Sequence, residues 1–450
     1  MQHLRANYPN ASCPIPTYLG SISYAFLAPA LQEALQESSF ASRTHIVPGE
    51  ADDWCALHAK DNAQSIIFTS DSDLVLYDYR PETLIAFLHD DDGSIGIKAY
   101  APDDIRKKLQ LNSLLPFAFV LLSGPQDISV DLARNARGIN QDSQEFIDFA
   151  RRYVTKGIAP ISLPQMNGSS LILAKLDVRV SEFVHQAMEG STAPLVYMPL
   201  LIEDPNQASA WNMGYDVRTL AYSLFANTNM TVHERRRKAQ GIAVQEIATY
   251  TAANITIPAT ELERQVSALT DWSTSKAASP ELIWPLFAIS LVLAELNTPP
   301  AIPLVLRVVN NDFDSTWSFV HLMARLQAAL YSLRMLKQTV EFWLKLNATA
   351  SSKLHTCLSS LAKHMQSFPP IPAMFGVSGQ PKKVLAEYER LKSLIEEIYV
   401  SAGAKVPTEQ VSNKKKKRQA READRKKKKA EQRRLPERET ANAFGALMTE

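Results

Sequence analysis

The sequence lacks the features of a secreted or membrane protein. Its three cysteines, Cys13, Cys55 and Cys357, are odd in number and widely spaced, which favours reduced thiols over a disulfide framework. The first residues contain no apolar segment of the signal-peptide type. The longest apolar stretch, Leu282–Leu296, includes a proline and a glutamate and is too short to span a bilayer. We therefore expect a nuclear or cytoplasmic protein with no membrane contact.

Several common catalytic motifs are also missing. The chain has no G-x-S-x-G nucleophile motif, no P-loop and no dinucleotide-binding fingerprint. What it has is an ordinary globular composition, with 450 residues that are 46% hydrophobic and 21% charged. This length predicts two or three domains with a sizeable apolar core.

The net charge of +1 hides a strong asymmetry along the chain. Residues 414–434 hold thirteen Lys/Arg and only three acids, so the rest of the chain is net negative. Residues 50–104 carry thirteen Asp/Glu against three Lys/Arg. An acidic region near one end and a basic tail at the other require separate explanations.

The order of secondary structure predicts an α/β region followed by a helical one. In the first 122 residues we expect short helices and strands in alternation. They are a helix over 21–40, a strand at 45–47, a helix over 50–60, strands at 65–69 and 74–77, a β-pair formed by 84–88 and 95–100, and helices at 103–109 and 114–122. This alternation indicates a largely parallel sheet. After about residue 140 we expect few strands and the helices 143–154, 282–296, 315–333, 338–346, 352–365 and 384–400.

Two acidic motifs lie within the α/β region. Glu50, Asp52 and Asp53 stand at the start of the helix over 50–60, and Asp71 and Asp73 directly follow the apolar strand 65–69. Residues two apart in extended chain project to the same side, and parallel sheets place their sites at the carboxyl ends of strands. We therefore expect four or five carboxylates to converge, an arrangement that hard cations such as Mg²⁺ or Mn²⁺ neutralise.

Each motif also has a simpler interpretation. Acids in the first turn of a helix complement its dipole, and Ser-Asp after a strand is common turn chemistry. The two motifs together, separated by one helix and one strand, favour a metal site of the kind that hydrolyses phosphodiesters with two ions.

The residues that carry these motifs resemble a known superfamily. Val47–Cys55 and Ile66–Leu74 are similar to the internal region of XPG/flap endonucleases, a PIN-like nuclease fold, and more narrowly to fungal Asteroid-domain proteins. Tyr18–Phe26, Pro199–Pro205 and Ser209–Trp211 also look like that family. The resemblance implies that Glu50, Asp52, Asp71 and Asp73 are catalytic and hold the metal. Asp53 is an extra acid that shares a helix face with Glu50 and is able to replace Asp52.

The sequence departs from the superfamily pattern at two places. No apolar strand ending in a metal-binding Asp precedes Ile46, so we expect an N-terminally truncated nuclease domain. Ser123–Asp127 stands where active members carry a further metal-binding Asp, and only Asp127 is available to replace it. The glycine hairpin that grips the DNA backbone is reduced to Arg137–Asn140.

The chain has two basic segments, and the first of them, the tail, suggests contact with nucleic acid. The tail suits phosphate binding and nuclear localisation, through a set of nine cations. These are Lys414, Lys415, Lys416, Lys417, Arg418, Lys426, Lys427, Lys428 and Lys429. The second cluster, His233–Lys238, is expected to be a solvated helix face.

These observations define three segments and two functional hypotheses. The expected segments are a partial nuclease domain (1–140), an α-helical domain (141–405) and a disordered basic tail (406–450). The first hypothesis is a Mg²⁺- or Mn²⁺-dependent, structure-specific nuclease that cleaves DNA, rather than RNA, near a flap or junction, with full, weakened or lost activity. The alternative is an inactive scaffold or nucleic-acid-binding protein on the nuclease fold.

Overall fold

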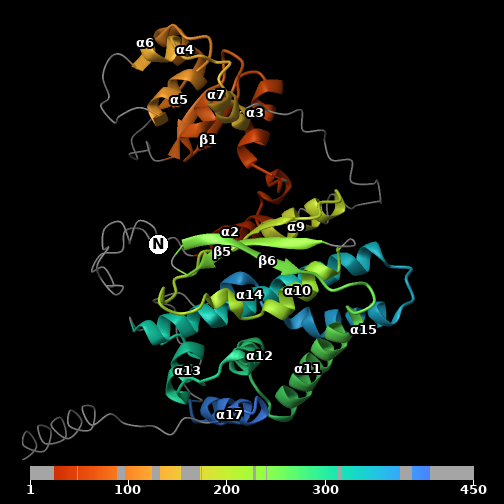
Figure 1. The fold of residues 1–450 in the computed structure, drawn as a ribbon. Coiled ribbons are helices and arrows are strands. Elements are labelled where there is room, and N and C mark those ends of the chain that lie inside the picture. Colours follow the sequence, from red (N-terminus) through yellow and green to blue (C-terminus); the bar gives the residue numbers. More distant parts are fainter. Residues whose placement is uncertain are drawn as a thin grey trace, which may run out of the picture.

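The fold was analysed in a computed structural model of the chain. The structure describes residues 25–47, 49–88, 97–123, 132–153, 173, 175–226, 230–239, 241–312, 316–375 and 388–405. The basic tail therefore lies outside the described residues, as does the segment from Gly124 to Asp127. Figure 1 shows two regions, a small one containing α3 to α7 and a larger one containing the remaining labelled elements.

The small region, which we call the acidic lobe, runs from Gly49 to Tyr153. Its elements are α3 (Ala51–Asp61), β1 (Ile66–Thr69), η2 (Ser72–Leu76), β2 (Leu84–Phe87), β3 (Ala99–Tyr100), α4 (Pro102–Leu109), α5 (Leu115–Ser123), α6 (Leu132–Arg137), α7 (Gln144–Ala150) and η4 (Arg151–Tyr153). Strand β2 is central, parallel to β1 and antiparallel to β3. The predicted parallel sheet is therefore a mixed sheet of three short strands in the part of the lobe that the structure describes.

One face of this sheet has a small apolar core. Ala56 and Ala59 of α3 pack with Ile67 of β1, Ile85 of β2 and Leu74 of η2. Helix α3 follows the N-cap residue Glu50, and its buried residues are both alanines, which allow close approach to the sheet. On the other side of β1, Ile66 and Phe68 are more than half exposed.

The local predictions for the lobe were mostly confirmed. The helix over 50–60, the strand at 65–69, the helices at 103–109 and 114–122, and the β2–β3 pair all exist. The strand expected at 74–77 is wrong, because Asp71 caps a 3-10 helix there. The strand expected at 45–47 is also wrong, since these residues have no regular structure.

The larger region, which we call the body, contains the main hydrophobic core. Its elements are α2 (Leu27–Gln36), η1 (Ala41–Arg43), α9 (Val178–Met188), β4 (Leu195–Tyr197), η5 (Ala210–Asn212), α10 (Tyr215–Ser223), β5 (Thr231–Lys238), β6 (Gly241–Ala248), α11 (Thr256–Ser275), α12 (Pro280–Glu295), α13 (Ile302–Val309), α14 (Trp317–Leu346), α15 (Lys353–His364), η6 (Met365–Ser367), α16 (Ile371–Met374) and α17 (Tyr388–Ser401). The 30-residue helix α14 replaces the two helices predicted over 315–346.

The body contains a sheet that the sequence did not predict. Strand β5 pairs in parallel with β4 and in antiparallel along its full length with β6. Helix α10 packs against α14, and Figure 1 shows both helices beside this sheet. The expectation of few strands after residue 140 was therefore wrong, and so was the helical interpretation of His233–Lys238, which belongs to β5.

The N-terminal helix α2 packs in the body and not in the acidic lobe. The ring of Phe26 is fully buried and stacks on Phe375 with centroids 3.9 Å apart. Glu33 of α2 forms an ion pair of 2.6 Å with Arg334 of α14. The chain then enters the lobe at Gly49, whose φ of +74° suits glycine and whose N–H donates to the Glu182 carboxylate of α9 at 2.9 Å. No helix among the described residues is long and apolar enough to cross a membrane.

Candidate active site

The three acids of the first motif lie around the N-terminus of α3. Glu50 is the N-cap residue, with extended backbone and no capping hydrogen bond from its side chain. Asp52 and Asp53 follow in the first turn, where the helix dipole favours negative charge. Glu50 is exposed, while Asp52 and Asp53 are half-buried. The simpler interpretation of this motif, in which first-turn acids complement the helix dipole, therefore agrees with the structure.

The two acids of the second motif lie just beyond the end of β1. The Asp71 N–H donates to the Thr69 hydroxyl at 2.9 Å, and the Asp71 carboxylate accepts from the Asp73 N–H at 3.0 Å. Asp71 thereby caps η2 and turns the chain. Both Asp71 and Asp73 are exposed at the carboxyl end of β1. The sequence placed them correctly, although η2 and not a strand follows them.

The acids of the second motif lie near enough to Asp52 of the first to act on its pKa. The pKa of Asp52 is raised above its usual 3.8 by partial burial first, and then by the charges of Asp71, Glu50, Asp73 and Asp53 in that order. All five predicted acids therefore share one electrostatic environment, with Asp52 at its centre. We call these five residues the acidic cluster.

Two tyrosines bind carboxylates of the acidic cluster. Tyr77 donates to Asp53 Oδ1 at 2.8 Å, and Tyr153 donates to Asp73 Oδ2 at 3.0 Å. Burial and the bond to Asp73 raise the pKa of Tyr153 to about 12, so this phenol is a hydrogen-bond donor at neutral pH. The sequence analysis missed both residues. No local pattern links Tyr153 to Asp73, because the two are eighty positions apart.

The donor chemistry of the acidic cluster fits a hard divalent cation, since all its ligating atoms are carboxylate oxygens. Among the residues that the structure describes, however, no group of three or more His, Cys, Asp or Glu is arranged to hold a metal ion. The expected convergence of four or five carboxylates into one set of ligands is therefore not seen among the described residues. Their role as metal ligands stays a prediction.

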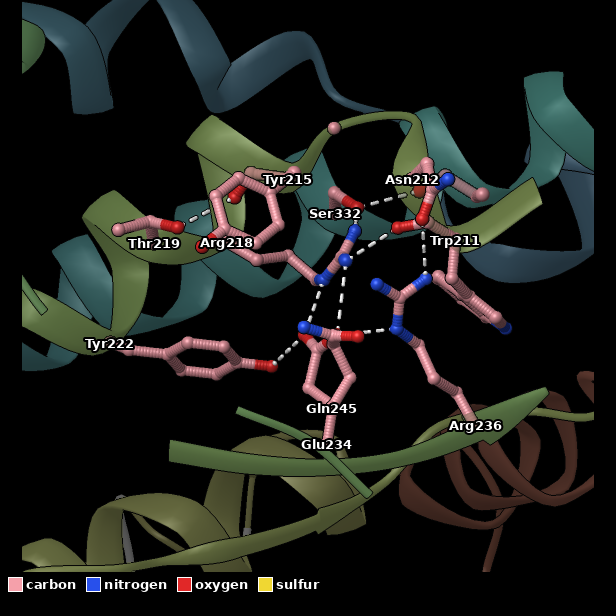
Figure 2. A network of polar contacts seen from close by, with 12 residues as sticks. Trp211, Asn212, Tyr215, Arg218, Thr219, Tyr222, Glu234, Arg236, Gln245 and Ser332 are labelled. Atoms are coloured by element: carbon pink, nitrogen blue, oxygen red, sulfur yellow. Dashed lines mark hydrogen bonds and ion pairs between the residues drawn. The ribbon is translucent and has the colours of Figure 1, made fainter. Parts of the chain in front are cut away.

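A second concentration of charge lies inside the body, where α10, α14 and the sheet meet. Glu234 of β5 is fully buried and accepts from Arg218 Nε at 2.6 Å and from the Tyr222 hydroxyl at 2.8 Å. Figure 2 shows Arg218 between Glu234 and Ser332, with Arg236 on the other side of the carboxylate. We call Arg218, Tyr222, Glu234, Arg236 and Ser332 the buried network.

A neighbouring set of polar contacts involves the downstream residues at 199–211 that resemble the family. Glu203 pairs with Arg237 at 2.6 Å and also accepts from the Ser209 hydroxyl at 3.3 Å. The indole N–H of Trp211 donates to the Pro199 carbonyl at 2.9 Å. These residues lock one loop onto β5, so the part of the resemblance at 199–211 has a structural explanation.

Glycine is required at one point beside the buried network. Gly214 has a φ of +70° and precedes α10. A Cβ at this position would lie 2.8 Å from the side chain of Ser332, closer than real contacts allow. Ser332 in turn accepts from Arg218 Nη1 at 2.8 Å. The close approach of α10 to α14 therefore places Ser332 within hydrogen-bonding distance of Arg218 in the buried network.

The comparisons with known proteins assign the family. The family model described as "XPG domain containing" matches residues 23–249, just over half of the chain. The chain belongs to this family. Its XPG-related region spans α2, the acidic lobe and the sheet β4–β6, so it includes both the acidic cluster and the buried network. A search of curated proteins and a search of solved structures each found no match.

Proposed function

We propose that this XPG-family chain, of the Asteroid type, is a divalent-metal-dependent endonuclease-like protein that acts on DNA phosphodiesters. The observation that carries the proposal is the position of five acids at the N-terminus of α3 and at the end of β1, where partial burial and then the four other carboxylates raise the pKa of Asp52. Such crowding of like charge is relieved most directly by a bound cation. The family match supports the same interpretation, because its range includes all five acids.

In this proposal Glu50, Asp52, Asp71 and Asp73 hold Mg²⁺ or Mn²⁺, and Asp53 adds a fifth carboxylate. A bound ion supplies a more acidic water and charge stabilisation for the leaving oxygen. The chain's own contribution is to hold the carboxylates of two segments at one edge of the sheet. The exposure of Glu50, Asp71 and Asp73 leaves that edge open to an extended substrate.

The basic tail adds a second element to the proposal. Its thirteen Lys/Arg suit contact with the phosphate backbone and nuclear localisation. Binding through such a segment falls steeply as salt rises, because it depends on counterion release. Contact through the tail is independent of the metal, so the two parts of the proposal are separable.

A second candidate function is a non-catalytic nucleic-acid-binding scaffold. The observation that favours it is the absence of a gathered three-ligand group among the described residues. In this case the acidic cluster would bind no ion with useful affinity, and DNA would be bound through the tail alone.

A cleavage assay distinguishes the two candidates. The full chain is incubated with flap, fork and single-stranded substrates in Mg²⁺ or Mn²⁺. We expect cleavage that is lost in Asp71→Ala plus Asp73→Ala and kept in the control Asp78→Ala plus Glu82→Ala. The control removes two exposed charges of the same lobe that do not act on Asp52. Cleavage that survives the first double substitution contradicts the assigned site, and binding without any cleavage supports the scaffold.

A further inference from the structure

Strand β1 forms one edge of the sheet in the acidic lobe. Among the described residues, β2 is the strand that pairs with it, in a parallel register that places Ile66 beside Leu84. The Leu84 N–H donates to the Ser65 carbonyl at 2.9 Å, so this carbonyl points toward β2. Because successive residues of a strand alternate in direction, the N–H and C=O groups of Ile66 and Phe68 point to the outer edge of the sheet.

The edge strand β4 of the body is covered by side chains of α9. Gln186 accepts from the Leu195 N–H at 2.8 Å and donates to the Leu195 carbonyl at 3.1 Å. Arg179 donates to the Tyr197 carbonyl at 2.7 Å. Proteins protect edge strands by covering them in this way, or by placing a charged residue or a proline in the strand. Strand β1, with the sequence Ile-Ile-Phe-Thr, has none of these protections among the described residues.

The outward-pointing residues of β1 also expose apolar side chains. Ile66 is 53% exposed and Phe68 is 54% exposed. The two are separated by one residue in the strand, so their side chains project from the same face of the sheet. Leu88, which follows β2, and Ile97, which precedes β3, are also more than half exposed. Unpaired main-chain groups beside exposed apolar side chains suit an extended segment that joins a sheet as an added strand.

The acids around this edge favour a positively charged occupant. Asp61 precedes β1, Asp71 and Asp73 follow it, and all three are exposed. A second copy of the lobe would bring the same excess of negative charge, since residues 50–104 carry thirteen Asp/Glu against three Lys/Arg. Pairing of two lobes would therefore place like charges close together. The occupant that fits best is an apolar strand attached to a basic segment.

The chain contains such a segment beyond Lys405, the last residue that the structure describes. Residues 414–434 hold thirteen Lys/Arg and three acids. They are followed at 444–448 by Phe-Gly-Ala-Leu-Met, whose alternate residues Phe, Ala and Met project to one side in extended chain. Residues 406–443 reach up to about 120 Å at about 3.3 Å per residue. This is several times the radius of gyration of about 22 Å of a compact chain of this length, so the segment is long enough to reach β1.

We propose that residues 414–448 dock on the acidic lobe of their own chain, with 444–448 added as a strand at the edge of β1 and the basic residues lying against the acids of the lobe. Docking covers Ile66 and Phe68 and occupies cations that also suit phosphate. The lobe and a nucleic acid therefore compete for the same Lys/Arg, and binding of nucleic acid releases the edge of β1. This inference goes beyond the proposed function and requires no metal ion in the lobe.

The test is photo-crosslinking in the full chain, with p-benzoylphenylalanine in place of Phe444. We expect the main cross-link on the peptide that contains Ile66–Thr69, within one molecule. Phe68→Asp should lower the yield about 10-fold, the factor expected for the loss of one buried aromatic contact. Leu200→Asp replaces an equally exposed apolar residue of the body and is the matched control, with an unchanged yield. Excess duplex DNA should also lower the yield, and a yield that DNA does not change would contradict the competition.

The remaining outcomes decide whether the segment docks on its own chain. A mixture of chains labelled with ¹⁴N and ¹⁵N distinguishes contact within one molecule from contact between two, and cross-links between labels would overturn the inference in favour of a second copy. Cross-links on the body alone, no cross-link, or equal losses in Phe68→Asp and Leu200→Asp would also overturn it. Thermal melting shows whether these two variants are folded.

Hydrogen exchange provides a check that needs no cross-linker. The amides of Ile66–Thr69 should exchange more slowly in the wild type than in Phe444→Asp plus Met448→Asp, whose substitutions lie outside the folded core described above. Equal exchange in the two proteins would mean that residues 444–448 do not pair with β1.

Discussion

The acidic lobe and the body use charge in opposite ways. In the body, Glu234 and Arg218 are fully buried, and every charge of the buried network lies beside an opposite one. In the lobe, the pKa of Asp52 is raised by its partial burial and then by the charges of four other acids. A buried network of opposite charges fixes a structure, whereas an exposed excess of one sign favours the binding of a ligand of the opposite sign. We therefore look for ligand binding in the acidic lobe and for stabilising interactions in the body.

The largest expected effect comes from removing the single anion of the buried network. Glu234→Gln leaves Arg218 and Arg236 without their counter-charge in the interior, and breaking a buried pair in this way costs about 3–5 kcal/mol. Urea unfolding of the variant measures the loss. Glu246→Gln on the neighbouring strand β6, where the side chain is exposed, is the control and should change stability by less than about 0.5 kcal/mol. Equal effects in the two variants would mean that the network is not a stabilising feature.

The same chemical change, Tyr to Phe, compares the two regions directly. Tyr222→Phe removes a buried hydrogen bond to Glu234, and bonds to charged groups contribute about 1.5–3 kcal/mol. Tyr77→Phe removes a bond to the half-buried Asp53, so a loss of about 1 kcal/mol or less is expected. Unfolding free energies of the two variants give the comparison. A larger loss at Tyr77 would reverse the contrast between the regions.

The smallest effect concerns the pH dependence of the acidic cluster. Because the pKa of Asp52 is raised above 3.8 in the folded chain, the folded state keeps this proton when the unfolded chain has lost it. The contribution of Asp52 is therefore most favourable at low pH and declines as pH rises above 3.8. Asp52→Asn should flatten this decline and raise metal-free stability at pH 7 by up to about 0.5 kcal/mol, the usual size of a repulsive pair.

Unfolding at a series of pH values, without divalent ions, tests this sign. Asp78→Asn serves as the control, since Asp78 is exposed and does not act on Asp52. A steeper decline in Asp52→Asn than in the wild type would show that the cluster does not repel itself.

The sequence predicted the lobe better than the body, for physical reasons. The acidic motifs, α3 and β1 follow from local patterns, namely acids before a helix and an apolar run before Asp71. Strand β5 was missed because two of its inward positions carry Glu234 and Arg236, so the apolar alternation of a strand is hidden. Their burial depends on Arg218, which lies on another element.

Long-range contacts explain the remaining differences. The helices predicted over 315–333 and 338–346 are one helix, α14, and Arg334 in the predicted gap pairs with Glu33 of α2, which is remote in the sequence. Tyr153 gave no indication of a role, since its partner Asp73 belongs to a distant part of the chain. The five acids of the candidate site were therefore predictable from sequence, while the residues that hold two of them in place were not.

The most direct test of the central claim is hydrogen exchange of the full chain with and without Mn²⁺, followed by mass spectrometry. The account predicts slower exchange at α3, at the end of β1 and at η2, with the sheet β4–β6 unchanged. This protection should disappear in Asp71→Ala plus Asp73→Ala. Exchange that is unaffected by Mn²⁺, or protection confined to the body, would contradict the assignment of the acidic cluster as a metal site.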